Sequence, residues 1–324
     1  MKAIVARGYG GPEVLEVQNL DIPVPAKNEI LIKVHVASAT RADTMMLTGK
    51  PYFARLFIGL TKPKNPIPGT GFAGEVVGVG SEVGQFNVGD RVFGESLFQF
   101  SSNAEYLAIP EDGVILPIPD SMKYEEAASY CDGPLTSYNF LKNLGKIQPD
   151  EKVLIIGASG ALGTAAVQLS KYFGAEVTGV SSGRNIGMVQ SLGADYVIDY
   201  TKEDFTTMEK HYDLIYDTVG KSSFKESKKV LSKDGLYLSP VLNFSLLIDV
   251  VFTSFSKGKK AIFDATGARK VDELKQFLAE LVNIFQEGKL RSVIDRQFPL
   301  EKVRQAHEYI VKGHKRGNVV ILVE

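Results

Sequence analysis

The spacing of apolar and polar residues changes twice along this chain. Up to about residue 120, short segments alternate apolar and polar side chains, as in residues 30–36 (Ile-Leu-Ile-Lys-Val-His-Val), and Gly and Pro separate them. Period-two alternation between turn residues is typical of antiparallel strands and predicts a barrel. Beyond this point, longer helical stretches alternate with short apolar runs. That second pattern predicts a parallel, doubly wound sheet, so the fold class is α/β.

The elements expected in the second and third parts can be placed individually. The parallel strands are expected at residues 152–156, 176–180, 196–198, 214–216 and 236–239. Near residue 268 the pattern changes again. It predicts an amphipathic helix over 271–287, a strand over 290–294, a helix over 300–312 and a closing strand over 318–323.

The most informative segment is the turn after the first parallel strand. An apolar run ends in Gly157-Ala-Ser-Gly-Ala-Leu-Gly163, and a helical pattern follows at once. Gly160 allows the backbone to approach a diphosphate, Gly163 allows the helix to pack on the strand, and the helix N-terminus offers free N–H groups. The backbone from Ser159 through Gly160, Ala161 and Leu162 to Gly163 is therefore predicted to bind a dinucleotide. Many α/β proteins share such a turn without binding nucleotides, so the next strand carries further weight.

The end of the second strand indicates which dinucleotide binds. An NAD site places Asp or Glu about 20 residues after the glycine turn, on the adenosine ribose. This chain has Ser181-Ser182-Gly-Arg184-Asn instead. Two hydroxyls and a guanidinium suit a 2′-phosphate, and no carboxylate repels it. NADPH is therefore the expected cofactor; the alternative is an ordinary polar loop with a solvated Arg184.

Composition excludes several other classes of protein. The 324 residues are 44% hydrophobic and 23% charged, enough for two folded domains. A net charge of −1 gives no electrostatic basis for nucleic-acid binding. One cysteine cannot form an intrachain disulfide, and no apolar stretch is long enough to span a bilayer. The cytoplasm is the expected location.

At the level of whole motifs the chain resembles the medium-chain dehydrogenase/reductase superfamily, in its zinc-free quinone oxidoreductase-like branch. The resemblance covers essentially the whole chain, and its motifs share the family's order. The matching segments are residues 68–76, 88–92, 104–106, 135–138, 157–163, 192–195, 213–220 and 317–320. The resemblance implies a GroES-like β-barrel domain formed by residues 1–122 and 268–324, with a Rossmann NADP-binding domain over 123–267 inserted between them.

The positions that hold catalytic zinc in relatives do not suit a metal here. By the resemblance these positions correspond to Thr40, Thr70 and Asp132. Catalytic zinc sites contain Cys or His ligands, sometimes together with a carboxylate, so two threonines and an aspartate make a poor zinc site. No metal is therefore expected. Without a Lewis acid, the substrate must itself delocalise the negative charge that hydride transfer creates. A quinone or an α,β-unsaturated carbonyl does so.

The predicted activity is thus NADPH-dependent reduction of a small, lipophilic quinone or enone. Two alternatives stay open: an NADP-dependent alcohol dehydrogenase acting on activated aldehydes or ketones, and a non-catalytic NADPH-binding sensor or structural protein. Measuring NADPH oxidation against a panel of quinones, enones, aldehydes and ketones would distinguish these three hypotheses.

Further site residues follow from the resemblance. Tyr200 is expected near the adenosine, Thr136 at the nicotinamide, and Ser239 and Val241 at its carboxamide, while Arg316 could reach a cofactor phosphate. Tyr52 is the candidate phenol near the substrate, although it could instead pack beside Phe53 and Phe57. Thr40 and Asp43 lie where the branch more often has Asn-x-x-Asp.

The apolar segment 242–255 has several possible roles: a dimer interface, a lid, a substrate-cleft wall or a membrane contact. The resemblance suggests a homodimer in which the strand around residues 261–263 pairs across a two-fold axis.

Overall fold

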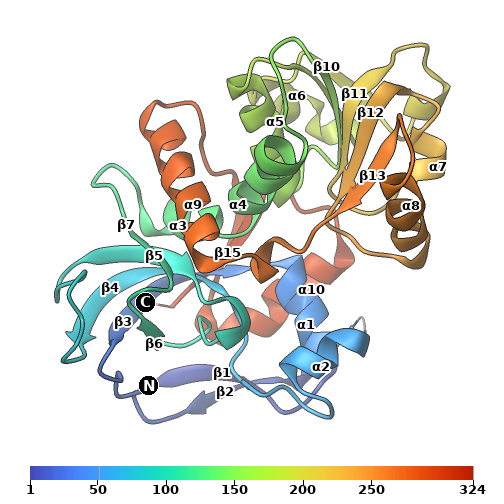
Figure 1. Cartoon of the computed structure of the whole chain (residues 1–324). Helices are drawn as coiled ribbons and strands as arrows, with labels where there is room; N and C mark the ends of the chain where they lie inside the picture. Colours follow the sequence, from blue (N-terminus) through green and yellow to red (C-terminus); the bar gives the residue numbers. More distant parts are fainter. Residues whose placement is uncertain (51, 324) are drawn as a thin grey trace. The chain divides into compact units, whose positions relative to one another are not determined.

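The computed structural model describes residues 1–50 and 52–323, without the side chains of Phe53 and Phe57, and separates into two compact units. Unit 1 comprises Met1–Asp132, Gly267–Val282 and Ile294–Glu324. Unit 2 comprises Gly133–Thr266 and Asn283–Val293. Each unit has its own sheet (Figure 1).

Unit 2 is built on a six-stranded parallel sheet. Its order, β10-β9-β8-β11-β12-β13, is that of a doubly wound nucleotide-binding fold. The strands are β8 (Lys152–Ile156), β9 (Glu176–Ser181), β10 (Tyr196–Asp199), β11 (Tyr212–Asp217), β12 (Leu231–Ser239) and β13 (Lys260–Phe263). The order reverses between β8 and β11, so their carboxyl ends frame the crevice where such folds bind ligands.

Helices cover both faces of this sheet (Figure 1). They are α4 (Gly133–Tyr138), α5 (Ala161–Tyr172), α6 (Ile186–Ser191), α7 (Phe224–Ser227) and α8 (Phe244–Ser254); a π-helical turn, Asn139–Leu144, follows α4. With both faces covered, the central strand β8 is apolar after its exposed first residue, Lys152, and Val153, Leu154 and Ile155 are fully buried.

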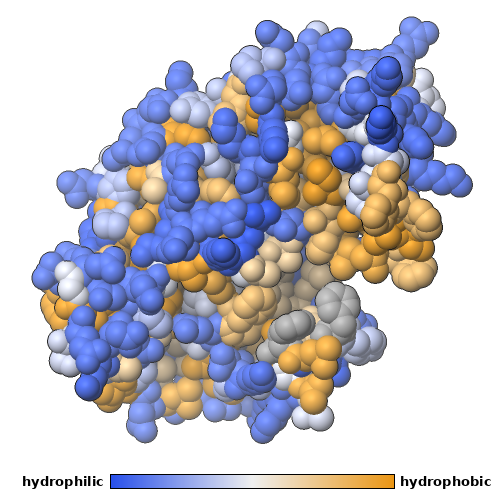
Figure 2. Space-filling view, viewed as in Figure 1, coloured by the Kyte–Doolittle hydropathy of each residue, from blue (hydrophilic) through white to orange (hydrophobic). Residues whose placement is uncertain are grey.

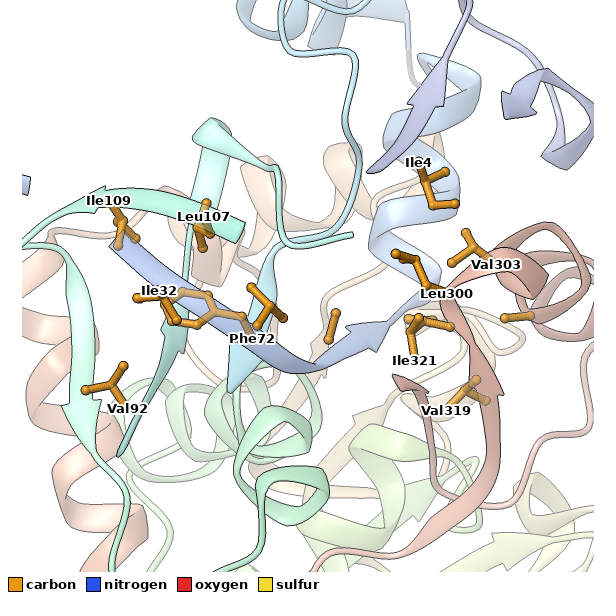
Figure 3. Packing of buried hydrophobic residues seen from close by; sticks show 14 of the residues in the cluster. Ile4, Ile32, Phe72, Val92, Leu107, Ile109, Leu300, Val303, Val319 and Ile321 are labelled. Carbon is orange, nitrogen blue, oxygen red and sulfur yellow. The ribbon is translucent and has the colours of Figure 1, made fainter. Parts of the chain in front are cut away.

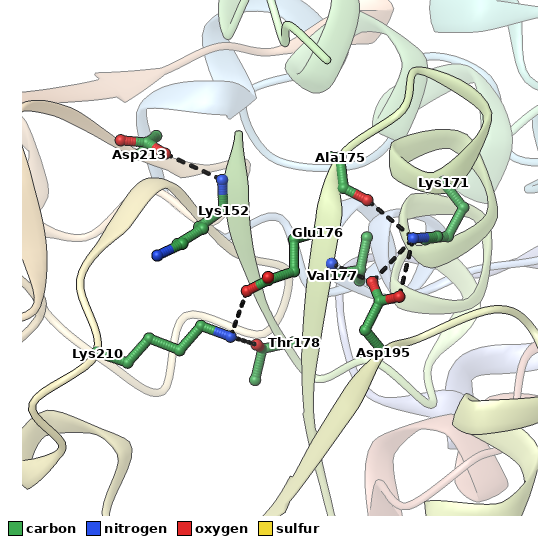
Figure 4. Close-up of polar contacts among 9 residues, drawn as sticks. All are labelled: Lys152, Lys171, Ala175, Glu176, Val177, Thr178, Asp195, Lys210 and Asp213. Carbon is green, nitrogen blue, oxygen red and sulfur yellow. Dashed lines mark hydrogen bonds and ion pairs between the residues drawn. The ribbon is translucent and has the colours of Figure 1, made fainter. Parts of the chain in front are cut away.

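Two ion pairs lie around strand β9 of the same sheet (Figure 4). The Lys171 ammonium at the end of α5 lies 2.9 Å from a carboxylate oxygen of Asp195, which also accepts the backbone N–H of Val177 on β9. Lys210 Nζ lies 2.6 Å from Glu176 on β9. Both pairs are partly solvated, so each contributes about 1 kcal/mol or less. Their main effect is to hold the register of β9.

Unit 1 contains a seven-stranded, mostly antiparallel sheet in the order β14-β15-β3-β4-β5-β7, with β6 paired to β3. A separate ribbon pairs β1 with β2. The strands are β1 (Lys2–Ala6), β2 (Leu15–Asn19), β3 (Glu29–Ala39), β4 (Gly71–Val79), β5 (Arg91–Glu95), β6 (Tyr106–Pro110), β7 (Val114–Pro117), β14 (Ile294–Pro299) and β15 (Asn318–Leu322). The helices are α1 (Arg41–Thr48), α2 (Arg55–Ile58), α3 (Tyr124–Tyr130) and α10 (Val303–Lys312), and α9 (Val271–Gln286) begins here and ends in unit 2.

The core of unit 1 joins residues from both ends of the chain. Ile32 and Phe72 from the first part pack in one cluster with Leu300, Val303 and Ile321 from the last (Figure 3). Burial of each such side chain contributes about 1.5–3 kcal/mol. The two ends of the sequence therefore stabilise each other.

These observations confirm the expected α/β class and the five parallel strands, each to within a few residues. The expected strand over 290–294 is wrong. Gln168 of α5 binds both backbone groups of Arg291, at 3.0 Å and 3.1 Å, so this stretch bonds to a side chain rather than to a sheet. The strand begins at Ile294 and runs parallel to β15, an orientation that the sequence had not indicated.

The unit boundaries differ from the expected domain limits at two segments. Residues 123–132 belong to unit 1, because α3 packs on β3 and β4. Residues 283–293 belong to unit 2, where the bonds from Gln168 hold them. Within the described part of the chain, no helix is both long and apolar enough to cross a bilayer.

Candidate functional site

The turn after β8 has the shape that a bound diphosphate requires. Gly157 adopts φ +79°, and a Cβ at Gly163 would lie 2.1 Å from the carbonyl oxygen of Gly157, so neither position tolerates a side chain. A Cβ at Gly160 would meet only that carbonyl oxygen, at 3.5 Å, so the space above this residue is open. Gly160 is the N-cap of α5 and provides no side-chain cap. The first N–H groups of α5 are thus available to an anion.

The end of β9 presents the residues expected at a 2′-phosphate. Arg184 is exposed and Ser182 half-buried. Ser181 is only 2% exposed, and its hydroxyl donates to the carbonyl oxygen of Ser182. Ser182 and Arg184 can therefore contact a phosphate directly, whereas Ser181 shapes the strand end.

Asn185 joins these two parts, and the sequence analysis missed it. Its Nδ2 donates to Ser159 Oγ at 3.0 Å and to Ser182 Oγ at 3.2 Å. The diphosphate turn and the 2′-phosphate loop are therefore fixed relative to each other before any cofactor binds. The only signals for Asn185 in the sequence were its amide side chain and its position next to Arg184.

Asp199 at the end of β10 is a second residue that the sequence analysis missed. It accepts bonds from the Thr201 hydroxyl at 2.7 Å and the Thr201 N–H at 3.1 Å, which hold the pKa of its carboxyl below the ordinary range. A Cβ at Gly183 would lie 2.5 Å from Asp199 Oδ2. This carboxylate thus supports the loop after β9, while the next residue, Tyr200, leaves its ring half exposed for contact with an adenosine.

Beside β8, the end of β11 is ordered by the buried carboxylate of Asp217. It accepts the N–H groups of Val219, Gly220 and Ser222 and the hydroxyl of Tyr237 at 2.8–3.0 Å. Sequence reasoning used Asp217 only as part of a motif. Its four bonds show that it shapes the crevice wall.

Ser239 and Val241 are tied to this network. Ser239 Oγ donates to the backbone carbonyl of Asp217, and the Val241 N–H donates to Ser239 Oγ. With that N–H already bonded, a carboxamide at Val241 would have to use its carbonyl oxygen. Ser239, 1% exposed, positions the strand end.

Thr136 completes the group in unit 2. It is half-buried on α4, whose next residue, Ser137, donates its hydroxyl to the carbonyl oxygen of Leu162 at 2.8 Å. A Cβ at Gly133 would lie 2.6 Å from the carbonyl oxygen of Ala161. Close packing therefore holds Thr136 beside the first turn of α5.

Unit 1 contains the remaining predicted residues, of which Thr40 and Asp43 form one buried pair. Asp43 Oδ2 accepts the backbone N–H of Thr40 at 2.9 Å and its hydroxyl at 2.8 Å, and the N–H of Asp43 donates back to Thr40 Oγ1. This reciprocal capping box starts α1. Thr70 Oγ1 lies 3.5 Å from the other carboxylate oxygen. Burial raises the pKa of Asp43 to about 7, with the Asp132 charge adding to the shift.

Two further acids stand near this pair. Burial raises the pKa of Glu95 well above its ordinary value, and it shares Thr70 as a hydrogen-bond partner with Asp43. Burial also raises the pKa of Asp132, and the Lys315 charge opposes that shift. Glu95 was not singled out from the sequence, although an acid ending the apolar strand β5 was a signal. All three carboxyls therefore have a higher pKa than an exposed acid, and each releases its proton at a higher pH.

The donor set at the positions of the family's zinc ligands remains poor in three dimensions. Thr40 and Thr70 offer hydroxyls that already bond to Asp43, and the neighbouring Cys131 donates its thiol to the carbonyl oxygen of Gly94 at 3.0 Å. Burial raises the pKa of Cys131 well above its ordinary value, so it is a thiol and not a thiolate. Among the residues that the structure describes, no group of three or more His, Cys, Asp and Glu side chains could hold a metal ion.

Tyr52 and Arg316 lie on the surface of unit 1. Tyr52 is 68% exposed, and the Arg55 guanidinium lies 5.0 Å from its ring centre. The alternative packing beside Phe53 and Phe57 falls on side chains outside the described residues. The backbone N–H of Arg316 donates to Asp295 at 2.9 Å, and its side chain is exposed.

Comparison with known proteins agrees with this geometry. Residues 26–120 match the model for the alcohol dehydrogenase GroES-like domain, and residues 192–321 match that for zinc-binding dehydrogenases. The chloroplastic quinone-oxidoreductase QR1 of Triphysaria versicolor is 31% identical over 99% of this chain and 98% of its own length.

Two other proteins extend the comparison. The chloroplastic NADPH-dependent alkenal/one oxidoreductase of Arabidopsis thaliana is 30% identical over 99% of this chain and 79% of its own length. The Escherichia coli quinone oxidoreductase, solved in complex with NADPH, has a TM-score of 0.86 and 26% identity over 99% of this chain and all of that one. The chain therefore belongs to the medium-chain dehydrogenase/reductase superfamily, in its quinone oxidoreductase-like branch.

Proposed function

We propose that this protein is a zinc-independent, NADPH-dependent reductase that transfers hydride to a quinone or an α,β-unsaturated carbonyl. One observation supports the proposal: unit 2 has a glycine turn with open space above Gly160, while the positions matched by resemblance to the family's metal ligands hold two threonines and an acid. The relatives' names, which include quinone and alkenal/one oxidoreductases, support the same class.

The residues of unit 2 fit NADPH. The open space above Gly160 and the first N–H groups of α5 suit the diphosphate, and Ser182 and Arg184 suit the 2′-phosphate. Ser159, Ala161, Leu162 and Gly163 complete the turn, and Tyr200, Thr136 and the carbonyl of Val241 are proposed for the adenosine and nicotinamide. When bound, NADPH supplies the hydride.

The protein's own chemistry is then positioning and proton supply. A quinone or enone spreads the charge that arrives with hydride, so hydrogen bonds can stabilise it in place of a metal. Asp43 is half protonated near pH 7. Because Thr40 donates to Oδ2, the proton of Asp43 is expected on Oδ1, which faces the Thr70 hydroxyl. We propose that Thr40, Asp43 and Thr70 deliver the final proton, with Tyr52 near the substrate and Arg316 near a cofactor phosphate.

Stopped-flow oxidation of NADPH against quinones, enones, activated aldehydes and saturated ketones tests this function. We expect turnover with the first two classes and none with saturated ketones. Activity confined to ketones or aldehydes would instead support an alcohol dehydrogenase. Tight NADPH binding without turnover on any compound would identify a sensor or structural protein.

We also propose a cytoplasmic homodimer. The supporting feature is β13, which stands at the end of the strand order in unit 2 and can pair with a second copy. Light scattering after size exclusion measures the mass, and microscopy of the tagged chain shows its location. A monomeric mass at micromolar concentration would contradict the dimer.

A further inference from the structure

Helix α8 is apolar on the face that points away from its own unit as well as on the face that packs against it. On the inner face, Leu246 is buried and Val250 packs with it in the core of unit 2. Thr253 Oγ1 accepts the backbone N–H of Ala261 at 3.1 Å, which attaches the helix to strand β13. The Asn243 side chain caps the helix start by accepting the N–H of Leu246 at 2.8 Å. The helix is thus anchored, and its outer face is not needed for folding.

That outer face is a continuous stripe of large apolar side chains, which we call the α8 stripe. Its members recur at helical spacing on one side: Phe244, Leu247, Ile248, Val251, Phe252 and Phe255. The three phenylalanines are 79%, 73% and 89% exposed. Figure 2 shows the patch as an orange group over α8. A helix that is apolar all round is normally covered, so this stripe calls for an occupant.

Positive charge surrounds the C-terminal end of the stripe. Residues 225–234 and 257–260 together contain seven lysines and two acidic residues, in a chain whose net charge is −1. The two segments are adjacent, because Lys259 Nζ donates to the carbonyl oxygen of Lys228 at 2.7 Å. A Cβ at Gly258 would also lie 3.3 Å from the carbonyl oxygen of Lys233. The lysines therefore form one cluster beside Phe255.

An apolar stripe with lysines at its edge matches an anionic lipid surface better than a second copy of itself. Aromatic side chains enter the boundary between headgroups and acyl chains, and lysines contact the phosphates above it. The phosphates of such a surface complement the lysines, whereas the α8 stripe of a second copy carries no phosphate for them to contact. We propose that α8 docks this protein on membranes containing anionic phospholipids, a property that goes beyond its proposed reductase activity.

Flotation of the full chain with lipid vesicles tests the proposal. Wild type should float with vesicles of phosphatidylcholine mixed with phosphatidylserine, less with phosphatidylcholine alone, and less again as salt rises. The double variant Phe252→Ser/Phe255→Ser should weaken binding by about 10-fold or more per phenylalanine. Lys257→Gln/Lys260→Gln should weaken it roughly fivefold per lysine, with a shallower salt dependence.

Controls distinguish docking from general stickiness or misfolding. Val24 is 89% exposed in unit 1, and Lys289 is exposed in unit 2 away from the stripe, so Val24→Ser and Lys289→Gln should bind like wild type. Because the substituted side chains are exposed, every variant should keep the wild-type melting temperature and NADPH affinity. No flotation of wild type, or equal flotation of all variants, would overturn the proposal. A wild-type dimer that Phe252→Ser/Phe255→Ser converts to a monomer would assign the stripe to self-association and also overturn it.

Discussion

The glycine turn of unit 2 and the carboxyl cluster of unit 1 differ in how they could stabilise negative charge. The turn offers backbone N–H groups from a rigid strand and helix, and residues one to six positions apart determine it. The cluster gathers Asp43, Glu95 and Asp132 from distant segments, and burial raises the pKa of each carboxyl. In the function proposed above, the first would bind an existing anion, whereas the second would supply a proton to neutralise a new one. Local geometry is enough for the former, but the latter needs the assembled barrel.

The largest expected effect tests the rigidity of the turn. Gly163→Val places its first side-chain carbon within 2.1 Å of the Gly157 carbonyl oxygen, and that backbone has nowhere to move against β8. We expect a loss of more than about 3 kcal/mol in the free energy of unfolding, together with loss of NADPH binding. Urea unfolding and fluorescence titration with NADPH measure the two effects.

A matched control is available in the same unit. A Cβ at Gly187 in α6 meets no atom within 4 Å, so Gly187→Ala should leave stability unchanged or raise it slightly. If Gly163→Val unfolds no more easily than this control, the turn is not the rigid element described above.

The second test concerns the proton on Asp43. Its pKa is raised from 3.8 to about 7, so between these values the folded protein holds a proton that the unfolded chain releases. The contribution to stability is therefore complete below about pH 4 and falls as pH rises to 7, by on the order of 4 kcal/mol. Asp43→Asn preserves the shape of the side chain and should remove this pH-dependent contribution to the free energy of unfolding.

The difference between wild type and Asp43→Asn is the quantity to measure, by urea unfolding at a series of pH values. Wild type alone would mislead, because His307 contributes the opposite slope. Burial lowers the pKa of His307 to about 4, so its contribution is lost as pH falls from 6.5 towards 4. Parallel curves for wild type and variant would show that Asp43 is ionised like an exposed acid.

The smallest effect concerns cofactor choice at the turn. Arg184→Ala removes a charged donor from the proposed 2′-phosphate site, so KM for NADPH should rise roughly 10- to 100-fold. The KM for NADH, which lacks that phosphate, should stay within about twofold. Lys202→Ala, which removes a nearby surface charge outside the proposed site, is the control. Equal losses for NADPH and NADH would contradict the assignment of Arg184.

Local patterns were enough to predict most of unit 2 and the helix α9, most of which belongs to unit 1. Strands β8 to β12, the turn and helix α9 follow from apolar runs, glycines and helical spacing within a few residues of one another. The failure at residues 290–294 is instructive. Leu-Arg-Ser-Val-Ile ends in two β-branched residues and suits a strand, yet the side chain of Gln168, more than 120 residues earlier, bonds to the backbone groups of Arg291 that a strand would use.

The candidate site residues also fall into two groups, according to whether their role depends on neighbours in the sequence or on distant segments. Gly160, Gly163, Ser182 and Arg184 could be proposed from the sequence because their expected chemistry depends on neighbouring residues, and their binding roles stay predictions. Asn185 and Asp199 could not, since the bond of Asn185 to Ser159 and the close approach of Asp199 to Gly183 arise only when strand ends meet at one edge of the sheet. For Thr40 and Asp43, nothing in the sequence indicated that the pair forms a capping box buried beside other acids.

By itself, the sequence determined the order of elements, the glycine-rich turn after β8 and the presence of Thr40, Thr70 and Asp132 at the positions matched to the family's metal ligands, because each depends on residue types at short or family-wide spacing. Only the tertiary structure decided that Asp43 shares Thr70 with Glu95, that Asn185 links two parts of the cofactor site, and that α8 leaves its outer face bare. Burial and the meeting of distant segments set these properties, and neither exists until the chain has folded.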